Sequence, residues 1–159
     1  KKREAITEMI TELCVSGVNA IVKSEECLQQ IRSLFDLDGI TVFSDRGNRL
    51  VCRNGNYMAE APDGRPGFED EGYLSLFGDD DIFVESNMIK LRSQNPAAYA
   101  VTQEQEVGAA LQCLSRKEGI PYTMVSFEVF NRNRKWSDKD VTLLTLLGHC
   151  IGDLLNYSE

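Results

Sequence analysis

The fold is decided by two apolar runs in the last third of the chain, VGAALQCL at 107–114 and PYTMVSFEVF at 121–130. The second run is rich in β-branched and aromatic residues, which favour strands. The segment between the runs, SRKEG at 115–119, is polar and ends in glycine. Two such runs joined by a short glycine-containing break are typical of a β-hairpin.

A helix is expected to follow this hairpin and to run to the end of the chain. After a polar segment from Asn131 to Lys135, apolar residues return at helical spacing, at Val141, Leu144, Leu147, Ile151 and Leu154. Ser137 is a natural N-cap, and Asp138 and Asp140 place acids in the first turn, where the helix dipole favours them.

Length and composition indicate one globular domain. The chain has 159 residues, of which 42% are apolar and 26% charged, so it is large enough for one core and is not of disordered composition. Its net charge of −8 argues against a nucleic-acid partner and against anionic membranes. The first residues, KKRE, show neither a signal peptide nor an initiator methionine, so we expect a cytoplasmic fragment, residues 1–159, of a longer protein.

Five cysteines are widely spaced and odd in number, with no C-x-x-C pair: Cys14, Cys27, Cys52, Cys113 and Cys150. This pattern does not predict a disulfide framework or a zinc site. We expect these cysteines to be reduced and to act as small buried apolar side chains.

Outward from the hairpin, the first third of the chain predicts two helices and a second hairpin. An amphipathic helix is expected over Arg3–Val22, and a second helix is expected to begin at a Ser24 cap and to end before Asp38-Gly39. Strands at Ile40–Ser44 and Arg49–Arg53 flank a turn at Asp45–Asn48.

The middle third is expected to hold a long loop over Asn56–Gly72, with four Pro or Gly residues in 62–67. For Asp79-Asp80-Asp81 we favour a helix N-cap over a cation site, because the run lacks the ligand spacing of a calcium loop. A helix is expected over Ile82–Arg92, stopped by Asn95-Pro96, and a short strand over Tyr99–Thr102.

The order helix, helix, hairpin, variable segment, strand, hairpin, helix resembles the GAF domain family over nearly the whole chain. The local match is Asn131-Arg132, Trp136 and Asp140-Val141, which is similar to the Asn-Lys…Phe-x-x-x-Asp-Glu signature of GAF domains in cyclic-nucleotide phosphodiesterases and cyclases. Asn131 and Asp140 match, whereas Arg, Trp and Val replace the usual Lys, Phe and Glu. The pattern is thus interpreted as an aromatic anchor and a helix start.

The resemblance implies an α+β fold, with an antiparallel sheet of about six strands. The N- and C-terminal helices would cover one face, and the middle helices and loops would cover a ligand pocket on the other. Candidate pocket residues come from the sheet and from the covering segment: Phe43, Tyr73, Phe83, Met88, Tyr99, Phe127 and Glu128.

The function expected from the resemblance is a sensory, non-enzymatic domain that binds an unidentified small molecule and regulates a covalently linked output domain. Diguanylate cyclases, phosphodiesterases, kinases and transcription regulators are the expected carriers. One alternative is a ligand-free dimerisation and relay module. The other is a free methionine-R-sulfoxide reductase, in which Cys52 and Cys113 would be neighbours if their strands paired.

We also expect a homodimer through the terminal helices. Several apolar residues lie off the main stripes of Arg3–Val22 and Asp138–Asn156 and would otherwise face water: Met9, Val18, Val22, Leu143 and Cys150. A helix that is apolar on more than one side needs a second partner, and a two-fold dimer is the commonest solution.

Overall fold

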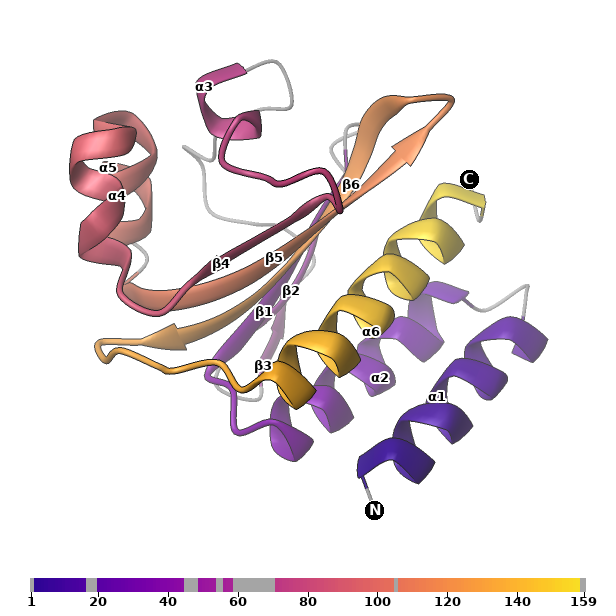
Figure 1. The fold of residues 1–159 in the computed structure, drawn as a ribbon. Coiled ribbons are helices and arrows are strands. Elements are labelled where there is room, and N and C mark those ends of the chain that lie inside the picture. Colours follow the sequence, from indigo (N-terminus) through magenta and orange to yellow (C-terminus); the bar gives the residue numbers. More distant parts are fainter. Residues whose placement is uncertain are drawn as a thin grey trace.

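A computed structural model describes residues 2–16, 20–44, 49–53, 56–58, 71–104 and 106–157. Its centre is an antiparallel sheet of six strands in the order β3-β2-β1-β6-β5-β4, with helices on both faces (Figure 1). The α+β architecture and the strand number expected from the sequence are both confirmed. The strands are β1 (Gly39–Ser44), β2 (Arg49–Arg53), β3 (Asn56–Met58), β4 (Ile82–Glu85), β5 (Val107–Lys117) and β6 (Ile120–Phe130).

The β5–β6 hairpin predicted from the sequence is the longest pairing of the sheet. Its strands extend further than the apolar runs, so that only Glu118 and Gly119 remain in the loop. Both have positive φ, 54° and 81°, which is the backbone of the two-residue turns that match strand twist. β6 also pairs with β1, which places the hairpin in the middle of the sheet.

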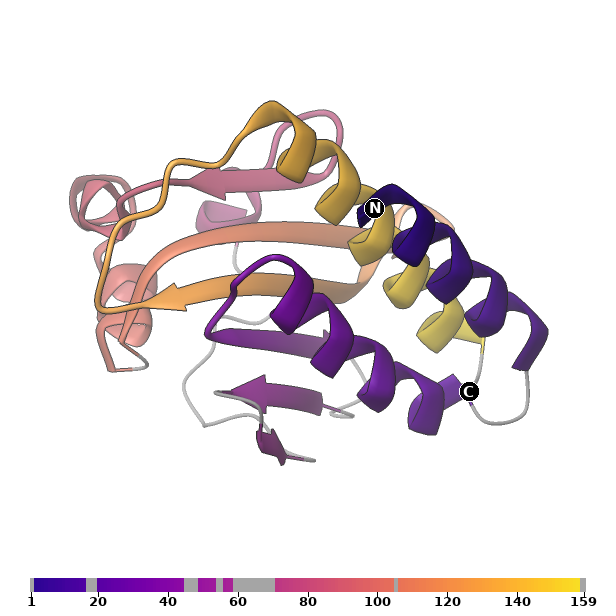
Figure 2. The same cartoon turned by 90° about the horizontal axis from the view of Figure 1, so that it is seen from below.

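Three helices cover one side of the sheet, which we call the helix face (Figure 2). They are α1 (Lys2–Ser16), α2 (Ala20–Leu34) and α6 (Asp138–Tyr157). α2 and α6 contact the strands, and α1 packs on α2 and α6. α1 and α6 run side by side in the same direction, and α2 runs the opposite way (Figure 1).

α6 begins and packs as its sequence dictates. The Ser137 Oγ accepts a hydrogen bond from the Asp140 amide at 3.1 Å, which confirms the predicted N-cap. Gly148 faces the sheet, and a Cβ there would lie 2.6 Å from the Cys113 Sγ. The absence of a side chain therefore allows the helix to approach β5 closely.

The helix face holds the larger of two apolar cores. Burying one of its large side chains contributes about 1.5–3 kcal/mol relative to exposure. Its members come from the strands, from α2 and the turn after it, and from α6: Leu28, Ile31, Phe35, Ile40, Val42, Leu111, Cys113, Val125, Phe127, Leu144, Leu147 and Ile151.

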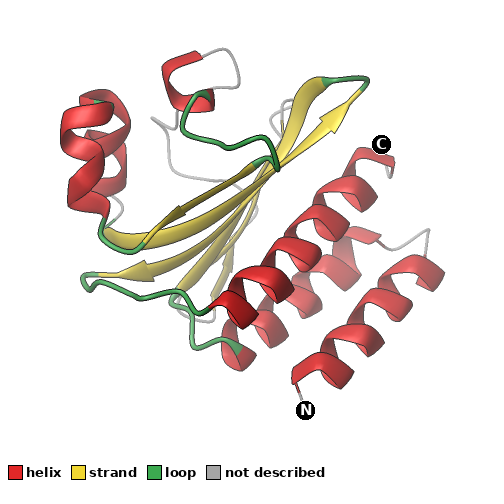
Figure 3. Cartoon of the chain, viewed as in Figure 1, coloured by secondary structure: helices red, strands yellow, loops and turns green. Residues whose placement is uncertain are grey.

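Short helices lie over the opposite side, which we call the distal face (Figure 3). They are α3 (Glu71–Leu74), the 3₁₀-helix η2 (Met88–Lys90), α4 (Leu91–Gln94) and α5 (Pro96–Glu104). A second apolar core lies between them and the sheet: Phe43, Tyr73, Phe77, Phe83, Met88, Leu91, Ala98, Val107, Ala110, Leu114, Met124 and Phe130. The expected division of terminal and middle helices between the two faces is confirmed.

The boundary between the first two helices differs from expectation. The single helix predicted over Arg3–Val22 is wrong, because α1 ends at Ser16 and α2 has begun by Ala20. Ser24 therefore lies inside α2 and is not its cap. α2 also ends earlier than predicted, since Asp36 adopts a left-handed φ of 53° and the Leu37 amide bonds the Arg32 carbonyl at 2.9 Å.

Two elements between 82 and 102 differ in type from the prediction. Ile82–Glu85 is the edge strand β4, because this short apolar piece pairs with β5. The strand predicted over Tyr99–Thr102 lies within α5. Pro96 occupies the first position of that helix, and the Asn95 Oδ1 accepts from the Ala98 amide at 3.1 Å, so Asn95-Pro96 starts a helix as well as ending one.

The aspartate run at 79–81 does not cap a helix. It forms a turn into β4, with a left-handed φ of 60° at Asp81. The Asp81 carboxylate accepts a hydrogen bond from the Arg116 Nε at 3.1 Å. No group of three metal-ligating side chains occurs among the described residues. The predicted turn at Asp45–Asn48 and 59–70 of the predicted loop lie outside the described residues. The two ends of that loop differ from expectation, since Asn56–Met58 is β3 and 71–72 belong to α3.

Candidate functional site

A row of polar side chains crosses the distal face at the centre of the sheet. Thr41 on β1 and Gln112 on β5 both oppose Ser126 on β6, so these residues lie side by side on three adjacent strands. Glu128, two positions along β6, shares this face because side chains alternate along a strand. All four are at most 5% exposed. Buried polar groups at the centre of a core are costly without partners.

The partners of this row form a hydrogen-bonded chain that ends on a carboxylate. The Tyr73 hydroxyl, on α3, donates to the Gln112 Oε1. The Gln112 Nε2 donates to the Ser126 Oγ at 3.1 Å, and the Ser126 hydroxyl donates to the Glu128 Oε2 at 2.9 Å. From β1, the Thr41 hydroxyl donates to the Glu128 Oε1 at 3.2 Å. Every donor therefore points toward Glu128.

The chain of hydrogen bonds has a definite chemical character. A carboxylate that collects donors is an acceptor, and neighbouring hydrogen bonds polarise one another in a low dielectric. On β5 and β1 the residues opposite Glu128 are Ala110 and Gly39, which are the smallest side chains available. The hydrogen-bonded cluster joins hydroxyl, carboxamide and carboxylate groups, without a histidine or cysteine.

Most of the predicted pocket residues meet on the distal face. Phe43, Tyr73, Phe83 and Met88 are buried in its core, and Tyr99 packs against it from α5. Glu128 is 1% exposed at the end of the hydrogen-bonded chain.

Phe127 is placed on the opposite side. It belongs to the helix-face core, with its ring 3.2 Å from the position of a Cβ on Gly148. Thr41, Gln112 and Ser126 were not predicted. Gln112 and Ser126 carried the signal that singled out Glu128, namely a polar residue inside an apolar strand.

No protein-family model and no curated protein matches this sequence. Solved structures match along its whole length. One is a protein with bound biliverdin IXa, solved in its far-red-absorbing dark state. Its sequence is 18% identical to this chain, with a TM-score of 0.65 and coverage of 97% of this chain and 98% of that one. The GAF domain of an Acinetobacter phosphoenolpyruvate-protein phosphotransferase is 10% identical, with a TM-score of 0.63 and coverage of 99% and 93%. The chain has the GAF fold.

A third similar structure is an enzyme. The free methionine-R-sulfoxide reductase of Neisseria meningitidis, in complex with its substrate, is 8% identical, with a TM-score of 0.65 and coverage of 98% of this chain and 89% of that one. At these sequence identities, the similarity to GAF domains shows the fold alone.

The cysteine pair considered for such an enzyme is not assembled by this GAF fold. Cys52 lies on β2 and Cys113 on β5, and β1 and β6 separate the two strands. The condition that their strands pair is therefore not met. Burial also raises the pKa of the Cys113 thiol to about 12, with the Asp80 carboxylate adding to the shift and a hydrogen bond with Thr145 opposing it.

The GAF signature region anchors the start of α6. The Arg134 guanidinium pairs with Asp140 at 3.3 Å, donates to the Phe35 carbonyl at 2.7 Å and lies 4.6 Å from the centre of the Trp136 ring. The Trp136 Nε1 donates to the Glu85 carbonyl at 3.1 Å. The interpretation of Trp136 as an anchor agrees with this geometry, but Arg134 holds Asp140, while Arg132 pairs with Asp38 at 3.4 Å.

Among the described residues, no helix is long and apolar enough to span a membrane.

Proposed function

We propose that this chain is a regulatory domain that binds a small molecule on its distal face and has no catalysis of its own. The observation that carries the proposal is the hydrogen-bonded chain from Tyr73 to Glu128, buried where a purely structural core would be apolar. A buried network of this kind costs desolvation, so a recognition role accounts for it. The ligand would present hydrogen-bond donors to Glu128. The biliverdin-bound relative supports a ligand role for this fold.

The expected carrier is a cytosolic, bacterial-type signalling protein with a linked output domain, such as a diguanylate cyclase, phosphodiesterase, kinase or transcription regulator. The parallel course of α1 and α6 supports this expectation, since two helices running in one direction can pass a shift along their common axis (Figure 1). The β6–α6 loop would supply the coupling, because Trp136, two residues before α6, donates to the last residue of the edge strand β4.

Native mass spectrometry of the purified domain, followed by thermal melting against a metabolite panel, tests the ligand role. A ligand present at 100 times its Kd should add about 2.7 kcal/mol to the free energy of unfolding. Glu128→Gln should abolish that increase, and Ser115→Ala, on the helix face, should leave it unchanged. A bare domain whose melting temperature responds to no metabolite would contradict the proposal.

A second candidate function is the ligand-free relay dimer. Two of the five apolar residues that motivate it are covered within this chain, since Met9 is 6% and Leu143 8% exposed in the helix-face core. Cys150 is half-buried, and the side chains of Val18 and Val22 lie outside what the structure describes. Leu146 on α6 supports it as well, because this apolar side chain is 53% exposed. If α6 carries the interface, Leu146→Glu should give a folded monomer in light scattering. A wild-type domain that is monomeric at high micromolar concentration would exclude the dimer.

A further inference from the structure

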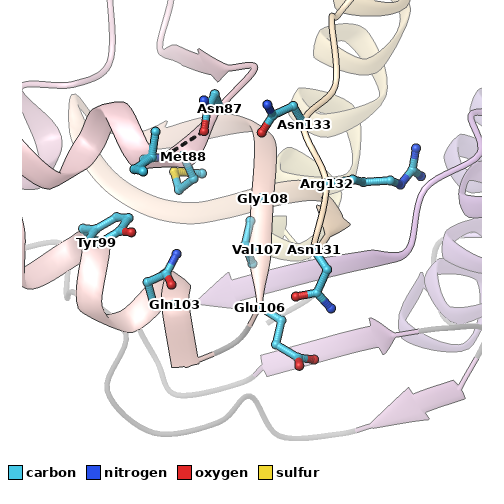
Figure 4. A pocket seen from close by; sticks show the side chains of 11 residues that line it. Asn87, Met88, Tyr99, Gln103, Glu106, Val107, Gly108, Asn131, Arg132 and Asn133 are labelled. Carbon is cyan, nitrogen blue, oxygen red and sulfur yellow. Dashed lines mark hydrogen bonds between the residues drawn. The ribbon is translucent and has the colours of Figure 1, made fainter.

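An open pocket lies at the end of the sheet, at the edge of the distal-face core. It has a volume of about 350 Å³ and is bounded by η2, α5, the first residues of β5 and the loop at 131–133 (Figure 4). Met88 and Val107, 1% and 3% exposed, form its apolar floor. Neither Glu128 nor any other member of the hydrogen-bonded chain lines it. It is therefore separate from the hydrogen-bonded chain, although Met88 and Tyr99 also belong to the pocket residues predicted for the distal face.

The walls of this pocket are held in place by backbone contacts. Asn131 and Glu106 both have left-handed φ, 56° and 64°, and the Asn131 amide donates to the Glu106 carbonyl at 2.9 Å. Gly108 lets the loop lie directly on β5, because a Cβ there would overlap the Arg132 carbonyl. The Arg134 amide donates to the Ser86 carbonyl at 3.0 Å and fixes the other side. The pocket is thus preformed, as ligand sites usually are.

Carboxamides dominate the chemistry of the rim. Asn87, Gln103, Asn131 and Asn133 come from three separate segments and surround the opening, with the Tyr99 ring at its side (Figure 4). Each carboxamide offers both donors and an acceptor. The Asn87 oxygen already accepts from the Ile89 amide at 3.2 Å, which leaves its NH₂ group for another partner.

Charge is nearly absent from the opening. The Arg132 side chain points away from the pocket in Figure 4, toward the Asp36 carbonyl and the Asp38 carboxylate, at 3.2 and 3.4 Å. Glu106 is then the charged side chain left among the lining residues. An anionic ligand would meet this carboxylate on a chain of net charge −8, and an apolar ligand would desolvate the amides without replacing their hydrogen bonds.

We propose that this pocket is a second ligand site, which takes a small neutral polyhydroxylated molecule of mono- or disaccharide size. Hydroxyl groups both donate and accept, so they match a rim of carboxamides, and the apolar face of a sugar ring can pack on Tyr99 and Met88. The ligand would touch Asn131 and Asn133 in the loop that leads into α6. Its binding would therefore reach the same helix as the distal-face site.

Amide chemical shifts of the ¹⁵N-labelled domain test the proposal, with glucose, maltose and myo-inositol as neutral probes and gluconate as the anionic one. The neutral probes should shift resonances of 87–89, 99–104, 106–108 and 131–133, and gluconate should bind more weakly. Loss of two hydrogen bonds in a Gln103→Ala/Asn133→Ala variant should weaken binding about tenfold or more. Both side chains are exposed and neither has positive φ, so the variant should fold.

Gln30→Ala is the matched control, because Gln30 is an exposed carboxamide on α2, on the other side of the sheet. It should leave the shifts unchanged, and so should Glu128→Gln, which separates this site from the distal-face site. No response to any neutral probe at tens of millimolar would overturn the proposal. Shifts of equal size in the Gln103→Ala/Asn133→Ala variant would overturn it as well.

Discussion

The two faces of the central strands hold different kinds of core. On β6, Val125, Phe127 and Val129 enter the helix face and pack against α2 and α6, whereas Ser126 and Glu128 enter the distal face and join the hydrogen-bonded chain. One strand of alternating side chains thus serves two purposes. The helix face gains stability from close apolar packing, and the distal face gives up part of that stability to keep polar groups that can select a ligand.

This difference predicts how substitutions on the two faces should behave. Removal of bulk should be costly on the helix face, since close-packed interiors relax only in part around a cavity. Removal of a polar group should be costly on the distal face and harmless on the helix face. Four variants or measurements test that contrast.

The largest effect is expected for Phe127→Ala. Phe127 is fully buried between β6 and α6, so truncation should lower the free energy of unfolding by about 3–5 kcal/mol. Urea denaturation followed by circular dichroism measures it. Ile120→Ala, at a side chain that is 67% exposed at the hairpin tip, should change it by no more than about 0.5 kcal/mol. Equal costs at the two positions would break the contrast.

Gly148→Ala should follow. The new methyl group would lie 2.6 Å from the Cys113 Sγ and 3.2 Å from the Phe127 ring. Overpacking of this kind costs about 1–3 kcal/mol, more than the helix propensity gained. In the Gly148→Ala/Cys113→Ala double variant, the absent sulfur should return about 0.5 kcal/mol or more relative to additivity. Strict additivity would show that contact with the sulfur does not account for the cost, since the Cys113 Cβ, 2.9 Å from the new methyl group, is kept in the double variant.

A pair of serines gives the sharpest comparison of the faces. Ser126→Ala removes the hydroxyl between Gln112 and Glu128 and should cost about 1–3 kcal/mol, because it leaves both without that partner. Ser115, on β5, is also buried, but its Oγ makes no hydrogen bond within the described part of the chain. Ser115→Ala should therefore be neutral or slightly stabilising. A reversed order would refute the division between the faces.

The smallest effect on stability near neutral pH is expected from ionisation of the Cys113 thiol. Its pKa of about 12, against an ordinary value of 9.0, means that the folded state holds the proton after the unfolded state has lost it. Stability contributed by the buried thiol is present below pH 9 and is lost as the pH rises toward about 12. At pH 8, iodoacetamide followed by peptide mass spectrometry should label Cys113 only after unfolding, whereas the half-buried Cys150 should react earlier.

The sequence predicted the elements whose local signals agree with each other. The β5–β6 hairpin combined two long apolar runs with a glycine turn, and α6 combined a cap with a continuous apolar stripe. The strand at Ile82–Glu85 was predicted as a helix, because three apolar residues followed by a helical turn do not distinguish a strand from a helix. Its strand character comes from pairing with β5, which is a tertiary contact.

Part of the site was within reach of the sequence. Glu128 was found because it is a polar residue in an apolar strand, and Gln112 and Ser126 carry that same signal. The choice of Phe127 beside Glu128 contradicted the period of a strand, since adjacent residues point to opposite faces. The Figure 4 pocket was beyond prediction, because its chemistry depends on where the Arg132 side chain points, and Asp36 and Asp38 decide that from nearly a hundred residues away.

Trp136 is the single tryptophan of the chain, and it sits at the junction between β4 and α6. It is 9% exposed, hydrogen-bonded through its indole and stacked against a guanidinium. Its emission is therefore a built-in optical reporter of that junction. A blue-shifted spectrum should mark the joined state, and a red shift with altered intensity should follow any event that parts the strand from the helix. The domain can be assayed by fluorescence without an attached dye.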